Sequence, residues 1–292
     1  MGDIFINMKQ MFRSGNILAK LIYINVGLFI LIRLAAVILK LFNLSWFPYL
    51  QYLQMPSSPE ELLYHPWTII TYMFTHYDFL HILFNMLWLY WFGGLFLSYF
   101  SERQLGGLYV LGGIAGGLLF ILSYNIFPYF SSMAANSYLM GASASVMAVV
   151  FAVSFYRKDQ EILLFLIGRV KLIYLALFTF VIDLLAITSE NAGGHIAHIG
   201  GALFGIWFAM RIKEGKDLTA PMNRIIDWMV NLGKRKPKMR VTYKRPETDY
   251  EYNARKHQAN VDIDAILDKL KRSGYESLSA DEKKKLFDAS KK

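Results

Sequence analysis

The sequence predicts an all-α membrane protein in which six helices cross the bilayer and a basic tail follows. Three observations lead to this fold class. Apolar residues make up 55% of the 292 residues and aromatic residues 16%, which is more than a soluble domain usually carries. The apolar residues gather in six stretches, and a hydrocarbon core of about 30 Å takes about 20 helical residues to cross. Residues 213–292 hold 20 Lys and Arg against 13 Asp and Glu, out of a net charge of +9.

The six apolar stretches are the predicted spans. Only helices satisfy their own backbone hydrogen bonds in lipid, so each stretch is expected to be helical. The stretches are residues 17–41, 79–99, 105–124, 139–156, 170–188 and 195–210. The last two are short and hold polar residues, which suits the interior of a bundle better than a lipid-facing position.

The direction of the spans is predicted by the basic residues between them. Lys and Arg precede the first span and recur at Arg103, from Arg157 to Lys171 and in the tail, whereas loops 42–78 and 125–138 have none. Because cytoplasmic loops carry the excess of Lys and Arg, both termini are expected in the cytoplasm. Loop 42–78 is rich in Trp and Tyr, which favour the membrane interface, and we expect most of it to rest in the headgroups.

Several classes of protein are disfavoured by composition. There is no cysteine, so neither a disulfide framework nor a thiol nucleophile is available. The basic start lacks a small-residue cleavage site, so the first apolar stretch is expected to remain as a span. A basic tail can indicate nucleic-acid binding, but this one directly follows a span and would attract anionic lipid at about 1 kcal/mol per charge. We therefore expect the lipid bilayer as a partner and no nucleic acid.

Four regions follow from these patterns. They are a cytoplasmic N-terminal segment (1–16), a six-helix domain (17–212), a basic juxtamembrane segment and linker (213–260) and a small helical cytoplasmic tail (261–292). An amphipathic stretch is expected at 222–232 and an unstructured linker at 234–260. In the tail, an apolar stripe ends at Gly274, and Ser279 and Glu282 form a capping box before a last helix.

Polar side chains inside the spans suggest a site, because such groups are costly in lipid. His81 and Asn85 are i and i+4 on one face of the second span. Asn85, Ser143 and His198 each lie 13 residues from the inner end of their span, which places all three about 20 Å above the inner face. His81 lies one turn higher.

This set of residues suits acyl transfer. A neutral histidine can take the proton of a serine and make it a nucleophile, and Asn, His and backbone N–H groups can stabilise an oxyanion. The sequence places no Asp to orient the histidine, so we expect a dyad rather than a triad. A GxxxG at Gly201 and Gly205, facing the small residues of the fourth span, allows the close approach that the reaction requires. Alone, each feature is more often packing or a local hydrogen bond.

On these residues the chain resembles the rhomboid family of intramembrane serine proteases, in its bacterial type. The matching motifs are His81-x-x-x-Asn85, Gly141-x-Ser143 and Ala197-His198-Ile-Gly-Gly201-x-x-x-Gly205. The resemblance implies that Ser143 is the nucleophile, His198 the base, and His81 and Asn85 the oxyanion hole. It also implies cleavage of single-span membrane proteins near the outer membrane face, without metal or cofactor, by a multi-pass protein of the bacterial cell membrane.

The two residues that follow the candidate nucleophile are Ala144 and Ser145. The family usually has Gly after the serine, whereas this chain has Ala144, whose methyl is expected to crowd the site slightly. Ser145 is the fallback nucleophile, but two residues along a helix turn it about 200° away from Ser143.

Alternatives to a serine protease stay open. One is a non-catalytic rhomboid-like protein that binds membrane helices, and another is a small membrane transporter. A zinc protease is disfavoured because the sequence has no His-Glu-x-x-His, and an aspartyl type because Asp183 is the only Asp in a span. Arg33 and Asp183 lie at matched depth, so we expect them to form a pair, directly or through water, that lowers the cost of both charges. The alternative is that Arg33 extends outward towards the level of Lys40 while Asp183 bonds to helix ends or loop amides.

Overall fold

The computed structural model describes residues 15–164, 168–231, 245 and 247–290. The chain divides into two compact units, Met1–Gly233 and Lys234–Lys292. The expected cytoplasmic segment before residue 15 and the expected linker at 234–244 lie outside the described residues.

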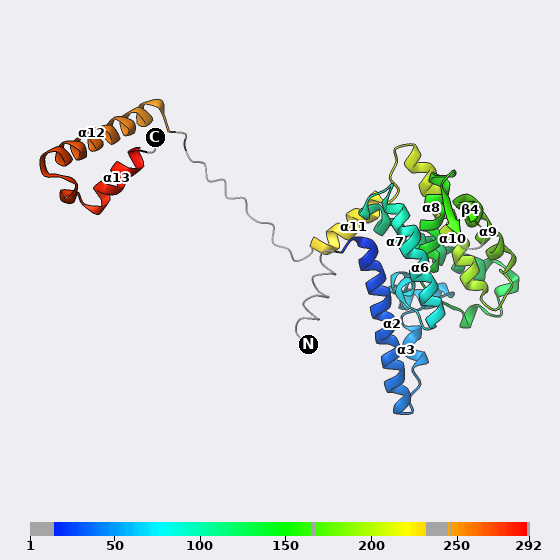
Figure 1. The fold of residues 1–292 in the computed structure, drawn as a ribbon. Helices are drawn as coiled ribbons and strands as arrows, with labels where there is room; N and C mark the ends of the chain where they lie inside the picture. Colours follow the sequence, from blue (N-terminus) through cyan, green and yellow to red (C-terminus); the bar gives the residue numbers. More distant parts are fainter. Residues whose placement is uncertain (1–14, 165–167, 232–244, 246, 291–292) are drawn as a thin grey trace. The chain divides into compact units, whose positions relative to one another are not determined.

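The first unit is a helical membrane bundle, which confirms the predicted fold class (Figure 1). Its main helices are α2 (Ile17–Leu41), α6 (Phe79–Leu97), α7 (Glu102–Ile126), α8 (Ser143–Tyr156), α9 (Leu172–Leu185) and α10 (Ala192–Lys213). By length and composition, α2, α6, α7 and α10 can cross a membrane. The apolar helices α8 and α9 have 14 residues each, about 21 Å, and are shorter than a hydrocarbon core of about 30 Å. Among the described residues, four helices rather than six therefore meet the length of a full span.

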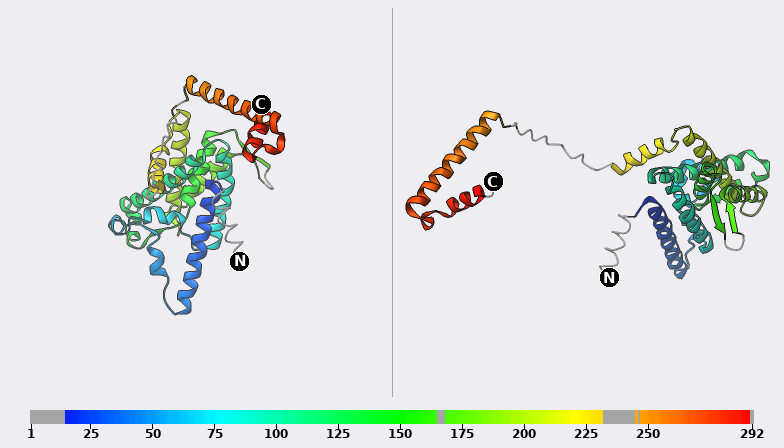
Figure 2. Two further views of the ribbon diagram at one scale, coloured as in Figure 1. Left: turned by 90° about the vertical axis from the view of Figure 1, so that its left-hand side faces the viewer. Right: turned by 45° about the horizontal axis from the view of Figure 1, so that its top comes forward.

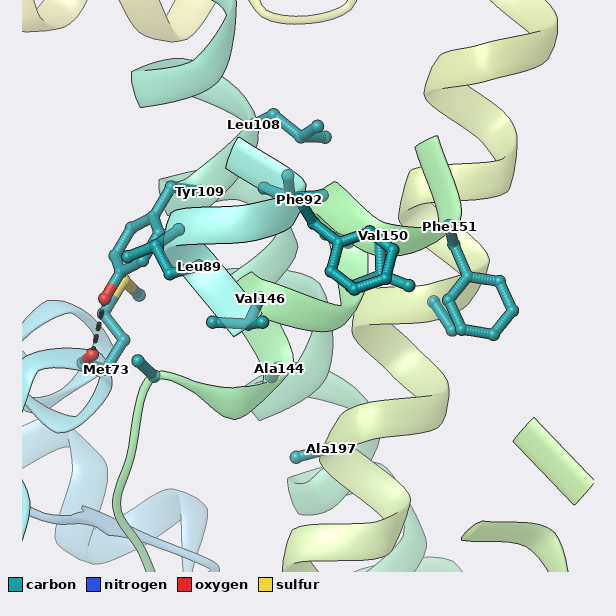
Figure 3. Close-up of a cluster of buried hydrophobic side chains, with 14 of the residues drawn as sticks. Met73, Leu89, Phe92, Leu108, Tyr109, Ala144, Val146, Val150, Phe151 and Ala197 are labelled. Carbon is teal, nitrogen blue, oxygen red and sulfur yellow. Dashed lines mark hydrogen bonds between the residues drawn. The ribbon is translucent and has the colours of Figure 1, made fainter. Parts of the chain in front are cut away.

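Helix α8 forms the centre of the bundle. Ten of its residues are buried, and Figure 3 shows its side chains meeting those of α6, α7 and α10 in one core. Gly201 of α10 lies so close to α8 that a Cβ there would be 2.0 Å from the carbonyl oxygen of Ala144. Gly205 makes the equivalent approach to Ala148, at 2.2 Å. The GxxxG motif therefore joins α8 and α10 backbone to backbone, as such motifs do in membranes.

The connection from α2 to α6 is an ordered part of the bundle. It contains α3 (Phe47–Gln51), β1 (Met55–Pro56), α4 (Pro59–Tyr64), α5 (Thr68–Thr71) and η1 (Tyr72–Phe74). Many of its aromatic side chains are exposed, but Met55, Tyr72 and Met73 are fully buried. The hydroxyl of Tyr72 donates to the carbonyl of Gly113 on α7. This inner part of the loop packs into the bundle, and the expectation that most of the loop rests in the headgroups stays a prediction.

Two short antiparallel pairs of strands were not predicted, and they shorten two expected spans. Strand β1 pairs with β2 (Tyr138–Leu139), so the fourth helix begins at Ser143 rather than at residue 139. Strands β3 (Glu161–Leu164) and β4 (Gly168–Lys171) form a hairpin beside the bundle (Figure 2), so the fifth helix begins at Leu172 rather than at residue 170. Two single turns, η2 (Pro128–Phe130) and η3 (Ala134–Asn136), follow α7.

The predicted amphipathic stretch is helix α11 (Ala220–Asn231). An ion pair between Arg103 and Asp227 attaches α11 to α7. In the turn before α11, Asp217 accepts a hydrogen bond of 3.2 Å from Gln104 of α7. Thr219, just before α11, is fully buried against Gly107. Helix α11 is therefore packed on the bundle and is part of the first unit.

The second unit contains α12 (Asp249–Ser273), η4 (Tyr275–Ser277) and α13 (Ala280–Ser290). Thr248 and Glu251 form a capping box, which starts a helix at Asp249, so the expectation of an unstructured linker up to residue 260 is wrong from there on. Gly274 ends α12 with φ +75°. The predicted capping box at Ser279 and Glu282 is confirmed by hydrogen bonds of 2.7 and 3.3 Å.

Candidate active site

Ser143 is the first residue of α8, and the turn before it is held from two sides. The N–H of Gly141 donates to the carbonyl of Tyr72 at 2.9 Å, and the N–H of Ala142 donates to Nε2 of His76 at 3.1 Å. Gly141 has φ +117°, and a Cβ there would lie 2.7 Å from Cε1 of His81. Both the backbone conformation and the ring against it require glycine.

The position of Ser143 at the helix start gives it backbone donors. The first bond of the α8 ladder runs from Val146 N to Ala142 O, so the N–H groups of the three residues from Ser143 precede the ladder. Such N–H groups, at the positive end of the helix dipole, bind anions. The sequence therefore places both a hydroxyl and oxyanion donors at one point.

The four predicted site residues line one pocket of about 290 Å³. The pocket is lined by His81, Phe84, Asn85, Trp88, Met140, Ser143, Val146, Met147, Asn191, Gly194 and His198. The Asn85 amide donates one N–H to the carbonyl of His81 at 2.9 Å, which leaves its second N–H for another acceptor. Within the described residues, no hydrogen bond joins the Ser143 hydroxyl to His198. The two residues share the pocket without a direct hydrogen bond between them.

Ser145 and Ala144 lie away from this pocket. Ser145 is fully buried, and its hydroxyl lies 3.9 Å from the sulfur of Met73. The methyl of Ala144 packs against Gly116 of α7, where a Cβ on the glycine would come within 2.5 Å of it. The expected crowding therefore falls on the helix interface, and neither residue lines the pocket.

A carboxylate orients His198, contrary to the sequence prediction. Oδ1 of Asp183 lies 2.9 Å from Nδ1 of His198 and 2.8 Å from Nδ1 of His195. The expectation that no Asp stands beside the histidine is wrong. The expected ion pair between Arg33 and Asp183 is also wrong, because the Arg33 guanidinium lies over the ring of Tyr77, 4.4 Å from its centroid.

The sequence held a signal for this contact. Asp183 lies 12 residues beyond Lys171, at the same estimated depth as His198, but depth along a helix does not say which neighbour a side chain faces. His76 gave no comparable signal, because it lies in a loop before α6 rather than in a span.

Asp183, His195 and His198 are also the described residues that could hold a metal ion. Their donor atoms all lie within 4.8 Å of one another, and carboxylate and imidazole groups are ligands that zinc takes. The short N···O distances instead satisfy all three groups by hydrogen bonding.

Comparison with known proteins places the chain in a family. A model of the rhomboid domain matches residues 64–214, just over half of the chain. The chain belongs to the rhomboid family. Members of this family are generally intramembrane serine proteases, and the match includes all the residues that line the pocket. In this rhomboid, residues 247–292 also match a family of unknown function (DUF6576), which corresponds to α12 and α13.

Related rhomboids share the central part of the chain. The presenilin-associated rhomboid-like protein, mitochondrial, of Homo sapiens is 30% identical over 166 residues, which cover 52% of this chain and 39% of that protein. RHOMBOID-like protein 12, mitochondrial, of Arabidopsis thaliana is 28% identical over 158 residues, which cover 51% of this chain and 47% of that protein. The chain spans less than half of the length of these curated relatives.

Proposed function

We propose that this rhomboid is an intramembrane serine endopeptidase that cleaves single-span membrane proteins near the outer membrane face. The observation that carries the proposal is the single pocket lined by Ser143, His198, His81 and Asn85. A hydroxyl, an imidazole and side-chain donors converge there from α6, α8 and α10. This is the set of groups that acyl transfer requires.

The proposed reaction begins when Nε2 of His198 takes the proton of Ser143, and Oγ attacks the carbonyl carbon of the scissile peptide. The second N–H of Asn85, a ring N–H of His81 and the backbone N–H of Ser143 stabilise the oxyanion. The C–N bond then breaks, the leaving amine takes the proton from His198, and an ester to Oγ remains. Water hydrolyses the ester by the same proton transfers in reverse, which restores the serine.

The short helix α8 supports cleavage of a membrane-embedded substrate. If its Tyr156 end lies at the inner face, Ser143 lies about 20 Å above that face, which is about 10 Å below the outer one. At that depth the site is recessed from the outer surface. We further propose that the protein lies in a bacterial cell membrane, from its resemblance to bacterial rhomboids, with both termini cytoplasmic, from the distribution of Lys and Arg.

The direct test is labelling with an activity-based fluorophosphonate, together with cleavage of a model single-span substrate in detergent or liposomes. Ser143→Ala is expected to abolish both labelling and cleavage, and His198→Ala to abolish cleavage. Ser145→Ala, two residues further along the same helix, is the matched control and is expected to retain both. A label found on Ser145, or near wild-type cleavage by Ser143→Ala, would contradict the assignment.

The same experiment separates the alternatives. A non-catalytic helix-binding rhomboid would retain the model substrate in a pull-down without labelling or cleaving it. A small transporter would neither bind the substrate nor react with the probe.

A further inference from the structure

This inference rests on the proposed function and concerns the tautomer of His198, the candidate base. The feature involved is the contact between α9 and α10 at Asp183. Helix α9 exposes most of its apolar side chains, while Asp183 is buried with Leu172 and Ala176. The spacing of these three residues places Asp183 on the face that packs against the bundle. An unpaired carboxylate at this depth costs about 3 kcal/mol or more, so its partners stabilise the bundle as well as the site.

One oxygen of the Asp183 carboxylate contacts a ring nitrogen of each of two histidines. Oδ1 of Asp183 lies 2.8 Å from Nδ1 of His195 and 2.9 Å from Nδ1 of His198. An ionised carboxylate only accepts hydrogen bonds, so both Nδ1 atoms carry protons. A neutral imidazole has one N–H, and Nε2 of His198 is then unprotonated, with its lone pair available to the pocket. This is the tautomer that can take the proton of Ser143.

We propose that Asp183 is a positioning residue, which holds His198 in the Nδ1–H tautomer and stabilises the imidazolium that forms when Ser143 is deprotonated. The catalytic unit is thus a serine, a histidine and an aspartate from three helices, rather than a dyad. The known consequence of losing such an aspartate is a large fall in kcat without loss of the fold.

His195 has a supporting role in the same arrangement. It lies one turn before His198 on α10, and the two rings meet edge to face with centroids 5.9 Å apart. Its Nδ1–H is a second donor to Oδ1, which keeps the carboxylate at one place between the two helices. The titratable side chains that line the pocket are His81 and His198. Asp183 lies outside the lining and contacts His198 from the α9 side, at Nδ1.

The test compares Asp183→Asn, Asp183→Glu and the control Thr179→Val, one turn earlier on α9, where the hydroxyl only donates to the carbonyl of Ala176. Asp183→Asn is expected to lower kcat by roughly 100-fold to 10⁴-fold, with KM within about twofold. Asp183→Glu is expected to recover part of the loss, and Thr179→Val to behave as wild type. His195→Ala is expected to lower kcat less than Asp183→Asn does.

A spectroscopic readout keeps the inference separate from the proposed function. Nitrogen NMR of isotope-labelled histidine is expected to show Nδ1–H and an unprotonated Nε2 for His198 in the wild-type protein, in which no substitution can disturb folding. A proton found on Nε2 instead would overturn the inference even if Ser143 is the nucleophile. Wild-type kcat in Asp183→Asn, or a larger loss in His195→Ala than in Asp183→Asn, would also overturn it. Failure of Ser143→Ala to abolish cleavage would contradict the proposed function and leave the tautomer measurement intact.

Discussion

The backbone N–H of Ala142 donates a hydrogen bond of 3.1 Å to Nε2 of His76. This bond ties the residue before Ser143 to the loop that precedes α6. His76 is fully buried, and its ring lies 5.2 Å from that of His81. Only a neutral imidazole can accept this bond, so the turn that positions the candidate nucleophile depends on the protonation state of His76.

Acid is therefore expected to destabilise the first unit through His76. Burial, with repulsion from His81, lowers the pKa of His76 from 6.5 to about 4. Between pH 6.5 and about 4 the unfolded chain binds a proton at His76 that the folded protein does not. The free energy of unfolding therefore decreases by about 3 kcal/mol in all as the pH falls from above 6.5 towards 4. As the pH falls over this range, the unfolding temperature in detergent is expected to decrease more steeply for the wild type than for His76→Gln. The glutamine amide can accept the bond without titrating. Equal slopes of unfolding temperature against pH for the two proteins would show that His76 does not cause the loss of stability in acid.

Much of the bundle could be predicted because span length and polarity are local properties. The first predicted span, residues 17–41, coincides with α2 (Ile17–Leu41). Depth counted along each helix also placed Asn85, Ser143 and His198 at one level, and they line one pocket. A count of residues gives height, however, and not the direction in which a side chain points. Arg33 and Asp183 were for this reason paired incorrectly.

The short strands could not be predicted for a different reason. Strands β1 and β2 have two residues each and come from segments more than 80 residues apart, too short for any alternation to be visible. Their pairing decides where α8 begins, and with it the exposure of Ser143 at a helix end. The turn that depends on this long-range pairing was therefore not predicted, whereas residues counted along helix faces were predicted at one level and line one pocket.

Asn85→Ala is expected to slow cleavage without eliminating it. One oxyanion donor contributes about 3 kcal/mol, or about 100-fold or more in kcat, and the donors at His81 and at the start of α8 remain. The measurement is kcat on a single-span substrate. Ser154→Ala is the matched control, because Ser154 also donates to the carbonyl four residues earlier but lies far along α8. Unchanged kcat in Asn85→Ala, or an equal loss in Ser154→Ala, would remove Asn85 from the site.

Gly201→Ala is expected to destabilise the bundle strongly. The new methyl would stand 2.0 Å from the Ala144 carbonyl, so α8 and α10 must separate, at a cost of about 1–3 kcal/mol or more. Gly94→Ala is the control, since nothing lies within 4 Å of its Cβ position, and alanine there is expected to be neutral or slightly stabilising. Thermal unfolding in one detergent compares the two variants. Similar unfolding temperatures would contradict the close contact.

Ala144→Gly, which restores the usual family residue, is expected to leave kcat within about twofold. The methyl packs on Gly116 and does not line the pocket. Its loss is expected to lower stability by about 1 kcal/mol, because glycine is a poorer helix former and a small space opens. Kinetics and thermal unfolding of the same preparation separate these effects. A large gain in kcat would show that the methyl does restrict the site.

The last prediction concerns truncation of the tail at two points, after Lys216 and after Gly233. Every residue that lines the pocket lies before Lys216, so truncation after Lys216 and truncation after Gly233 both keep the site. Truncation after Lys216 also removes α11, and with it the partners of Arg103 and Gln104 on α7 and the buried Thr219.

We therefore expect truncation after Gly233 to leave both kcat and the unfolding temperature near the values of the full chain, since it follows the boundary between the two units. The protein truncated after Lys216 is expected to retain cleavage but to unfold at a temperature several degrees lower. The reason is that Thr219 no longer packs against α7 at Gly107. Arg103→Ala in the full chain is the matched control for the ion pair alone, and it is expected to lower the unfolding temperature less, since exposed ion pairs contribute about 1 kcal/mol or less. Equal unfolding temperatures for the two truncated proteins would show that α11 does not stabilise the bundle. If the protein truncated after Gly233 no longer cleaved its substrate, the second unit would have a part in the reaction.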